Sequence, residues 1–139
     1  MKNYKNPLLA ALMPLLFLTA TFELLAQEKQ TELSDFKIIV EKTGTGIKMT
    51  GIAGCTWTDL SFSINNHQPQ AIDTFGMTVL DRISENKNEN FANFLFAITK
   101  TEYGFELKGI EGTAWTKLNF SLAENERQTI DQFGMTNLN

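Results

Sequence analysis

Two tryptophans are the side chains of this chain best suited to contact a ligand. Trp57 and Trp115 each combine a flat apolar ring with one N–H donor, and this combination stacks well on a sugar ring or a peptide. Both stand in the same local sequence, Gly-x-x-Trp-Thr-x-Leu-x-Phe-Ser, so together they predict two equivalent contact sites on a ligand-binding surface. The alternative, and the more usual fate of a large aromatic residue, is that each ring fills the core.

Two aspartates form a second pair of equivalent residues. Asp73 and Asp131 lie in Ile-Asp-Thr-Phe-Gly-Met and Ile-Asp-Gln-Phe-Gly-Met. Paired carboxylates that share a proton drive aspartic proteases, but a phenylalanine interrupts the Asp-Thr-Gly pattern in both copies. The main prediction is that each carboxylate caps a turn by accepting a nearby backbone N–H. An enzyme that uses Asp73, Asp131 or Glu111 in acid–base chemistry is the competing hypothesis.

The other reactive side chains do not form a recognisable catalytic or metal-binding set. His67 is the only histidine and Cys55 the only cysteine, which gives little support to a Ser-His-Asp triad or a zinc site. Because Thr113 replaces Cys55 in the second copy, we expect the cysteine to be a small, half-buried filler. A disulfide-linked dimer or a reactive thiol is the alternative. We expect no cofactor and no metal.

These residues belong to an internal duplication that organises the chain. Residues 36–78 and 94–136 align without a gap at an offset of 58 residues, and 19 of 43 aligned positions are identical. One copy of this length is near the size below which a core is seldom sufficient. We therefore expect one β domain over 35–139, in which both copies share a core around a pseudo-two-fold axis and a polar linker spans 79–93. Two separate units on that linker are the alternative.

Alternating apolar residues predict four short strands in each copy. The strands expected in the first copy are 36–41, 47–50, 57–64, which Trp57 opens, and 70–78, the last with a kink at Gly76. The second copy repeats this pattern, and its first strand is apolar on both faces because of Leu95 and Ala97. Eight short strands with turns roughly every 8–12 residues predict an all-β sandwich or a small barrel.

Two pairs of glycines mark bends between these strands. Gly46 and Gly104 follow the first strand of each copy, where a short hairpin needs a residue with positive φ. Gly54 and Gly112 end the repeated Gly-Ile-x-Gly segment. Two glycines three residues apart interrupt a regular strand, so this segment predicts a β-bulge or a tight corner before each tryptophan.

The first 26 residues are typical of a secretory signal peptide. Lys2 and Lys5 precede an apolar stretch, and Ala26 suits a cleavage site. An uncleaved membrane anchor is the alternative, although residues 8–26 fall at the short end of a bilayer span. Residues 27–34 are polar and predict a flexible lead-in. The expected destination is the periplasm, the cell surface or the medium.

Net charge excludes two classes of partner. The chain carries −4, and removal of the predicted signal, whose two lysines and one glutamate contribute +1, leaves −5. An acidic chain without a basic patch suits neither nucleic acid nor an anionic membrane surface. The expected partner is an extracytoplasmic protein or a glycan, bound by a sheet face or by the dissimilar loops at 65–70 and 123–128. A homodimer is a further alternative.

The repeated signature resembles that of small exported proteins of Bacteroidetes-type bacteria. It consists of Gly-x-x-Trp-Thr-x-Leu-x-Phe-Ser followed by Ile-Asp-x-Phe-Gly-Met, and Gln27 is similar to the mature start common in such secreted proteins. The resemblance covers both repeats and brings no activity and no functional residues. The sequence thus predicts an exported binding or interaction module. A small carboxylate-dependent hydrolase and a structural envelope protein are the alternatives.

Overall fold

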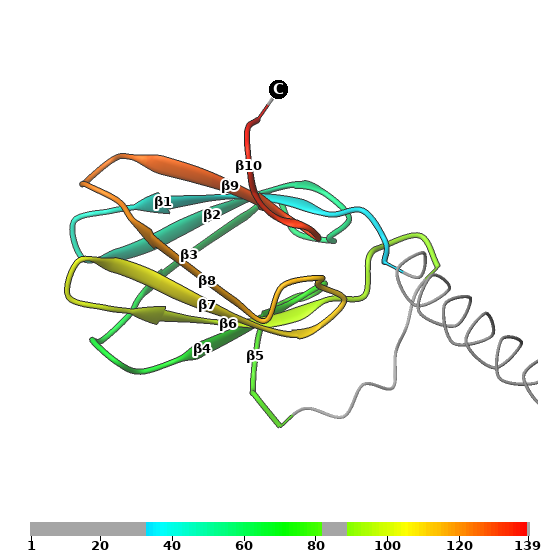
Figure 1. Cartoon of the computed structure of the whole chain (residues 1–139), viewed down its shortest axis with the longest axis horizontal. Helices are drawn as coiled ribbons and strands as arrows, with labels where there is room; N and C mark the ends of the chain where they lie inside the picture. The colour runs from blue at the N-terminus through cyan, green and yellow to red at the C-terminus, as the bar shows by residue number, and fades with distance from the viewer. Residues whose placement is uncertain (1–32, 82–88, 139) are drawn as a thin grey trace, which may run out of the picture. The chain divides into compact units, whose positions relative to one another are not determined.

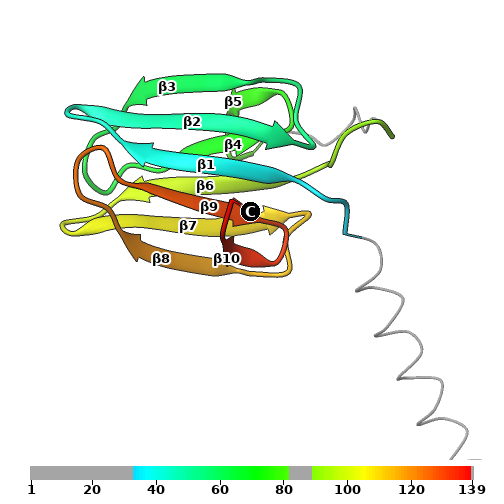
Figure 2. The same ribbon diagram turned by 90° about the horizontal axis from the view of Figure 1, so that it is seen from above.

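A computed structural model describes residues 33–81 and 89–138 of the chain. The predicted signal peptide (1–26) and most of the predicted lead-in therefore lie outside the described residues. The described part forms ten β-strands in two antiparallel five-stranded sheets that pack together (Figure 1, Figure 2). The predicted all-β fold is confirmed, as a sandwich. Within these residues there is no helix long and apolar enough to cross a membrane.

Each repeat forms five strands, at positions that correspond to within one residue. The strands of the first repeat are β1 (Lys37–Lys42), β2 (Gly46–Ala53), β3 (Asp59–Ser63), β4 (Gln70–Asp73) and β5 (Gly76–Thr78). Those of the second repeat are β6 (Leu95–Lys100), β7 (Gly104–Glu111), β8 (Lys117–Ser121), β9 (Arg127–Asp131) and β10 (Gly134–Thr136).

The expected fourth strand of each repeat is a hairpin rather than one kinked strand. The chain reverses after Asp73, so that Ile72 of β4 pairs with Met77 of β5. The carboxylate of Asp73 accepts the N–H of Phe75, and Gly76 adopts a φ of 125°. A strand cannot continue through this capped turn, which is why ten strands replace the predicted eight.

Each sheet combines strands from both repeats. Sheet A has the order β10-β9-β1-β2-β3, and sheet B has the order β5-β4-β6-β7-β8. The first three strands of one repeat thus pair with the last two strands of the other. The pairing of Ile38 with Ile130 in sheet A corresponds to that of Phe96 with Ile72 in sheet B. Neither repeat forms a sheet by itself, which does not fit two separate units; the pseudo-two-fold axis stays a prediction.

The central strands β1 and β6 supply much of the shared core. Phe36 immediately precedes β1, and its counterpart Phe94 immediately precedes β6; the two rings stack with their centroids 4.4 Å apart. The side chains that point between the sheets follow the predicted alternation, and they are Phe36, Ile38, Val40, Phe94, Phe96 and Ile98. Leu95 and Ala97, on the opposite face of β6, are also buried, as their apolar character predicts.

Gly46 and Gly104 have a different role from the one predicted. Neither is among the residues with positive φ, so the expected conformational reason is wrong. A Cβ atom on Gly46 would lie 2.1 Å from the carbonyl oxygen of Phe62, and one on Gly104 would lie 2.1 Å from that of Phe120. The neighbouring strand comes too close for any side chain, so packing rather than φ requires glycine.

The Gly-Ile-x-Gly segment forms the predicted bulge. Two consecutive residues of β1 pair with Gly51 and Ala53, which leaves Ile52 as the extra residue on β2. Gly54 follows with a φ of 82°, and its counterpart Gly112 has a φ of 72°. A residue with a side chain seldom adopts these angles, so each glycine is needed where the chain bends toward the tryptophan.

Candidate functional site

Both tryptophans are buried between the sheets. Trp57 is 9% exposed and Trp115 is 8% exposed. The indole Nε1 of Trp57 donates to the carbonyl oxygen of Asp73 (3.0 Å), and that of Trp115 donates to the carbonyl oxygen of Asp131 (2.9 Å). Since the rings lie in the core and the N–H groups are bonded, the hypothesis that these tryptophans stack on a ligand at the surface is wrong. They position the hairpins instead.

The two aspartates cap tight turns, as the sequence predicts. Asp73 Oδ1 accepts the N–H of Phe75 at 2.8 Å, and Asp131 Oδ1 accepts those of Phe133 at 2.8 Å and Gly134 at 3.1 Å. Asp73 ends β4 in sheet B, whereas Asp131 ends β9 in sheet A. Asp131 also lines a depression of about 300 Å³ that Asp73 does not line. The geometry gives no support to an aspartic dyad.

The residue after each aspartate fastens one repeat to the start of the other. Gln132 accepts the N–H of Phe36 at 3.0 Å and donates to the carboxylate of Asp35 at 2.8 Å. At the equivalent position, the hydroxyl of Thr74 accepts the N–H of Phe94 at 3.3 Å. Both side chains are buried, so their polar atoms serve the fold and are not available to a substrate.

Cys55 occupies the half-buried filler position that the sequence predicts. Its thiol contacts the carbonyl oxygen of Trp57 at 3.5 Å, and the hydroxyl of Thr113 donates to the carbonyl oxygen of Trp115 at 2.8 Å. Burial raises the pKa of the Cys55 thiol above its usual value. A raised pKa keeps the thiol protonated and unreactive, so this position does not indicate a nucleophile.

The dissimilar loops share one backbone conformation. His67 and Asn125 are equivalent, and they have φ values of 64° and 69°. The N–H of His67 donates to the carbonyl oxygen of Lys100 (2.9 Å), and that of Asn125 donates to the carbonyl oxygen of Lys42 (2.8 Å). The loops are thus anchored to the other repeat, but they present different side chains. Among the described residues, no group of three or more His, Cys, Asp or Glu side chains could hold a metal.

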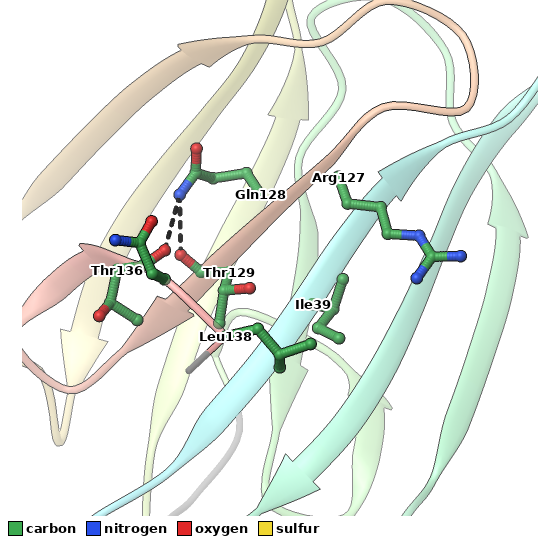
Figure 3. Close-up of a pocket in the computed structure, with 7 residues that line it drawn as sticks. Ile39, Arg127, Gln128, Thr129, Thr136 and Leu138 are labelled. Carbon is green, nitrogen blue, oxygen red and sulfur yellow. Dashed lines mark hydrogen bonds between the residues drawn. The ribbon is translucent and has the colours of Figure 1, made fainter.

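One shallow pocket lies on the outer face of sheet A. It measures about 280 Å³ and has Ile39 at its centre, Arg127 on one side and Leu138 on the other (Figure 3). The Nε of Arg127 donates to Glu41 at 2.8 Å, and the amide of Gln128 donates to the carbonyl oxygens of two neighbouring residues. Because these polar groups have partners within the domain, the pocket is a weak candidate for a small-molecule site.

The exposed apolar side chains provide a stronger candidate. Of the ten large hydrophobic residues that are exposed in the described part of the chain, eight form four pairs, identical in the two repeats. These pairs are Ile52 and Ile110, Phe75 and Phe133, Met77 and Met135, and Leu80 and Leu138. The buried core positions of β1 and β2 differ from those of β6 and β7, for example Ile38 and Phe96. The core thus accepts other apolar residues, and packing does not explain why the exposed ones are the same.

Part of this apolar set gathers at the two open sides of the sandwich. The edge strands β3 and β5 lie on one side, and β8 and β10 lie on the other (Figure 2). Leu60 and Phe62 on β3 are half-buried and pack against the core, and Met77 on β5 is 50% exposed. A Cβ on Gly76 would lie 3.8 Å from Leu60 Cδ2, so the two edges adjoin. Exposed Phe75 lies in the adjacent turn.

We define two edge strips from these residues. The first edge strip consists of Leu60, Phe62, Phe75 and Met77. The second edge strip consists of the identical counterparts Leu118, Phe120, Phe133 and Met135. Sequence reasoning missed the strips because Phe75 and Met77 fell inside an expected strand. The signal that could have revealed them is identity between the repeats.

Comparison with known proteins adds no functional assignment. No family model, curated protein or solved structure matches the chain significantly.

Proposed function

We propose that this chain is an exported, non-catalytic interaction module that binds a protein partner through its two edge strips. The observation that carries the proposal is the presence of the same exposed phenylalanine and methionine on both sides of one domain. Exposed apolar residues that cluster, rather than occurring singly, are typical of protein-interaction surfaces. Methionine adapts its shape to different partners, which suits such a surface.

Each edge strip combines apolar side chains with an open strand edge. Within sheet A, β3 pairs with β2 alone, and within sheet B, β5 pairs with β4 alone. A strand at a sheet edge presents N–H and C=O groups that an added strand can use. An extended segment of a partner can pair with such an edge and place alternate apolar side chains against the strip.

The turns hold the exposed residues in fixed positions. Phe75 donates its N–H to the carboxylate of Asp73, and the carbonyl group of Asp73 accepts the indole N–H of Trp57. Binding residues that are already ordered lose little conformational entropy when a partner arrives. The buried tryptophans therefore contribute to recognition by positioning the strips.

Export is part of the proposal and is supported by the composition of residues 1–26, with lysines before an apolar stretch and a small residue at the cleavage position. An extracytoplasmic protein is then the partner that the strips would meet. The resemblance of the repeated signature to that of exported Bacteroidetes-type proteins favours the same compartment.

Paired substitutions at the strips test the proposal. Phe75→Ser with Met77→Ser, and Phe133→Ser with Met135→Ser, remove exposed apolar area without opening the core. The matched control is Tyr103→Ser, because Tyr103 is 77% exposed and belongs to neither strip. Immobilised mature chains are incubated with envelope and extracellular fractions, and bound proteins are quantified by mass spectrometry.

We expect the unmodified chain and the Tyr103 variant to retain the same protein. Each strip variant should lose at least about 90% of it, because apolar contacts at the centre of an interface dominate binding. Equal retention by all variants would contradict the proposal, as would hydrolysis of a polymer without any bound protein.

A further inference from the structure

The two edge strips have the same apolar residues but opposite charges beside them. Asp59 begins β3 at the first strip, and Lys117 begins β8 at the equivalent position of the second strip; both are exposed. One strand further in, Lys48 of β2 corresponds to Glu106 of β7, which is again a reversal of charge. At these two positions, each side therefore carries the charge opposite to that of the other.

The side of the sandwich that carries the second edge strip retains positive charge at its edge. Lys108 pairs directly with Lys117 across β7 and β8, and like charges in this arrangement repel. Glu106 approaches Lys117 at 3.6 Å, so one carboxylate stands beside two ammonium groups. On the first side the residue opposite Asp59 is the uncharged Thr50. A carboxylate arriving at the second side would relieve this repulsion.

We propose that the occupant of the strips is a second copy of this chain, with the first edge strip of one copy against the second edge strip of the next. This proposal rests on the proposed function, because it requires the strips to be binding surfaces. With the docked strands running in the same direction, docking of unlike strips brings Asp59 toward Lys117, whereas docking of like strips brings equal charges together. The apolar residues match in either case, so charge decides the pairing.

The position of the strips determines the form of the assembly. They lie on opposite sides of the sandwich, at the β3 and β5 edges and at the β8 and β10 edges (Figure 2). A contact between two different surfaces leaves one strip free on each terminal copy. Association therefore continues beyond a dimer, into an open chain of copies or a closed ring.

Charge exchange tests this proposal on the full mature chain, residues 27–139. Asp59→Lys places a lysine at the start of both β3 and β8, and Lys117→Asp places an aspartate at the start of both. The double variant Asp59→Lys/Lys117→Asp restores opposite charges with the sides exchanged. The control is Glu102→Lys, an exposed charge change in the hairpin loop between β6 and β7. Sedimentation velocity at low salt, over a range of concentrations and with a reductant present, measures the association.

We expect the unmodified chain and the control to form concentration-dependent oligomers that dissociate in high salt. Each single variant should weaken association at least about tenfold, since tenfold corresponds to only about 1.4 kcal/mol. The double variant should recover most of the lost affinity. The double variant contains both single substitutions, so a fold defect caused by either one would persist in it. Recovered association in the double variant therefore cannot be explained by such a defect.

A monomeric unmodified chain at every concentration would overturn the inference, as would a folded double variant that fails to recover. If that monomeric chain still captures a different protein through the strips, the proposed function survives without self-association. If the paired strip substitutions change neither self-association nor capture, both proposals are wrong. A dimer that forms only without reductant would instead indicate a disulfide through Cys55.

Discussion

The indole nitrogen of Trp57 lies 3.0 Å from the carbonyl oxygen of Asp73 and donates a hydrogen bond across the sandwich. Trp57 precedes β3 of sheet A, and Asp73 ends β4 of sheet B. Trp115 makes the same bond to Asp131 from sheet B to sheet A. Each tryptophan therefore fixes a hairpin of the opposite sheet, and with it the exposed phenylalanine and methionine of an edge strip.

Loss of this bond should destabilise the domain. Trp57→Phe keeps an aromatic ring but leaves the buried carbonyl of Asp73 without its indole donor, at a cost of about 1–3 kcal/mol. Trp115→Phe should cost a similar amount, because its bond is equivalent. Urea unfolding of both variants measures the change. In each variant the remaining tryptophan should show blue-shifted, poorly quenched emission; unchanged stability with readily quenched emission would contradict the assignment.

Addition of one methyl group at Gly46 should be far more damaging than at Gly44. In Gly46→Ala the new Cβ meets the backbone of Phe62 at 2.1 Å, and backbone cannot move aside as a side chain can. At Gly44 the nearest atom is the carboxylate oxygen of Glu124, at 3.2 Å, on a flexible exposed side chain. We expect Gly46→Ala to lose about 3 kcal/mol or more and Gly44→Ala to lose about 1 kcal/mol or less. Equal thermal midpoints for the two variants would disprove the packing argument.

The carboxylate of Asp131 should matter for folding through its acceptor oxygen. Asp131→Asn keeps an oxygen that can accept the N–H groups of Phe133 and Gly134, whereas Asp131→Ala removes it. We expect a loss of about 1–2 kcal/mol for alanine and clearly less for asparagine. Chemical denaturation provides the measurement. Two variants of equal stability would exclude the capping role and reopen the question of chemistry at this residue.

Cys55 should react slowly with alkylating reagents. Burial raises the pKa of its thiol, and only the thiolate attacks such reagents. At about pH 8 the native chain should therefore be modified more slowly than the urea-unfolded chain, and its rate should continue to rise at higher pH than the rate of the unfolded chain. Mass spectrometry of timed samples follows the modification. Equal rates in the native and unfolded chains would show that the thiol is not buried and that its pKa is not raised.

The polar counterpart of Cys55 provides a control for its structural role. Thr113 makes the equivalent contact with the carbonyl oxygen of Trp115 at 2.8 Å, so Cys55→Thr should preserve the fold. We expect a change in stability within about 1 kcal/mol. A large loss would show that the surroundings of Cys55 and Thr113 differ and that the two side chains are not structurally equivalent.

Local pattern was enough to predict the first three strands of each repeat and the all-β class, with a sandwich as one of two architectures. Alternation placed Phe36 and Phe94 in the core, and the glycine spacing predicted the bulge at Ile52. The same reasoning could not predict the exchange of strands between repeats. Both repeats have the same apolar pattern, so the pattern of β4 does not indicate whether it pairs with β1 or with β6.

The incorrect predictions for Trp57 and Gly46, and the missed exposure of Met77, also have physical causes. Trp57 lies outside the alternating stretch of β3, so periodicity could not assign it to the inside or the outside. Glycine at position 46 has two explanations, positive φ and close approach, and sequence does not separate them. Met77 fits the pattern of a buried strand, and its exposure follows from the position of β5 at a sheet edge.

Site-specific photocrosslinking in cells of the source organism tests the central claim, that the edge strips are the binding surface, most directly. A photoreactive phenylalanine analogue replaces Phe75, Met77, Met135 or, as the exposed control outside the strips, Tyr103. We expect crosslinks from the three strip positions to one common protein, which is a second copy of this chain if the strips mediate self-association. Crosslinks from Tyr103 alone, or from none of the positions, would contradict the claim.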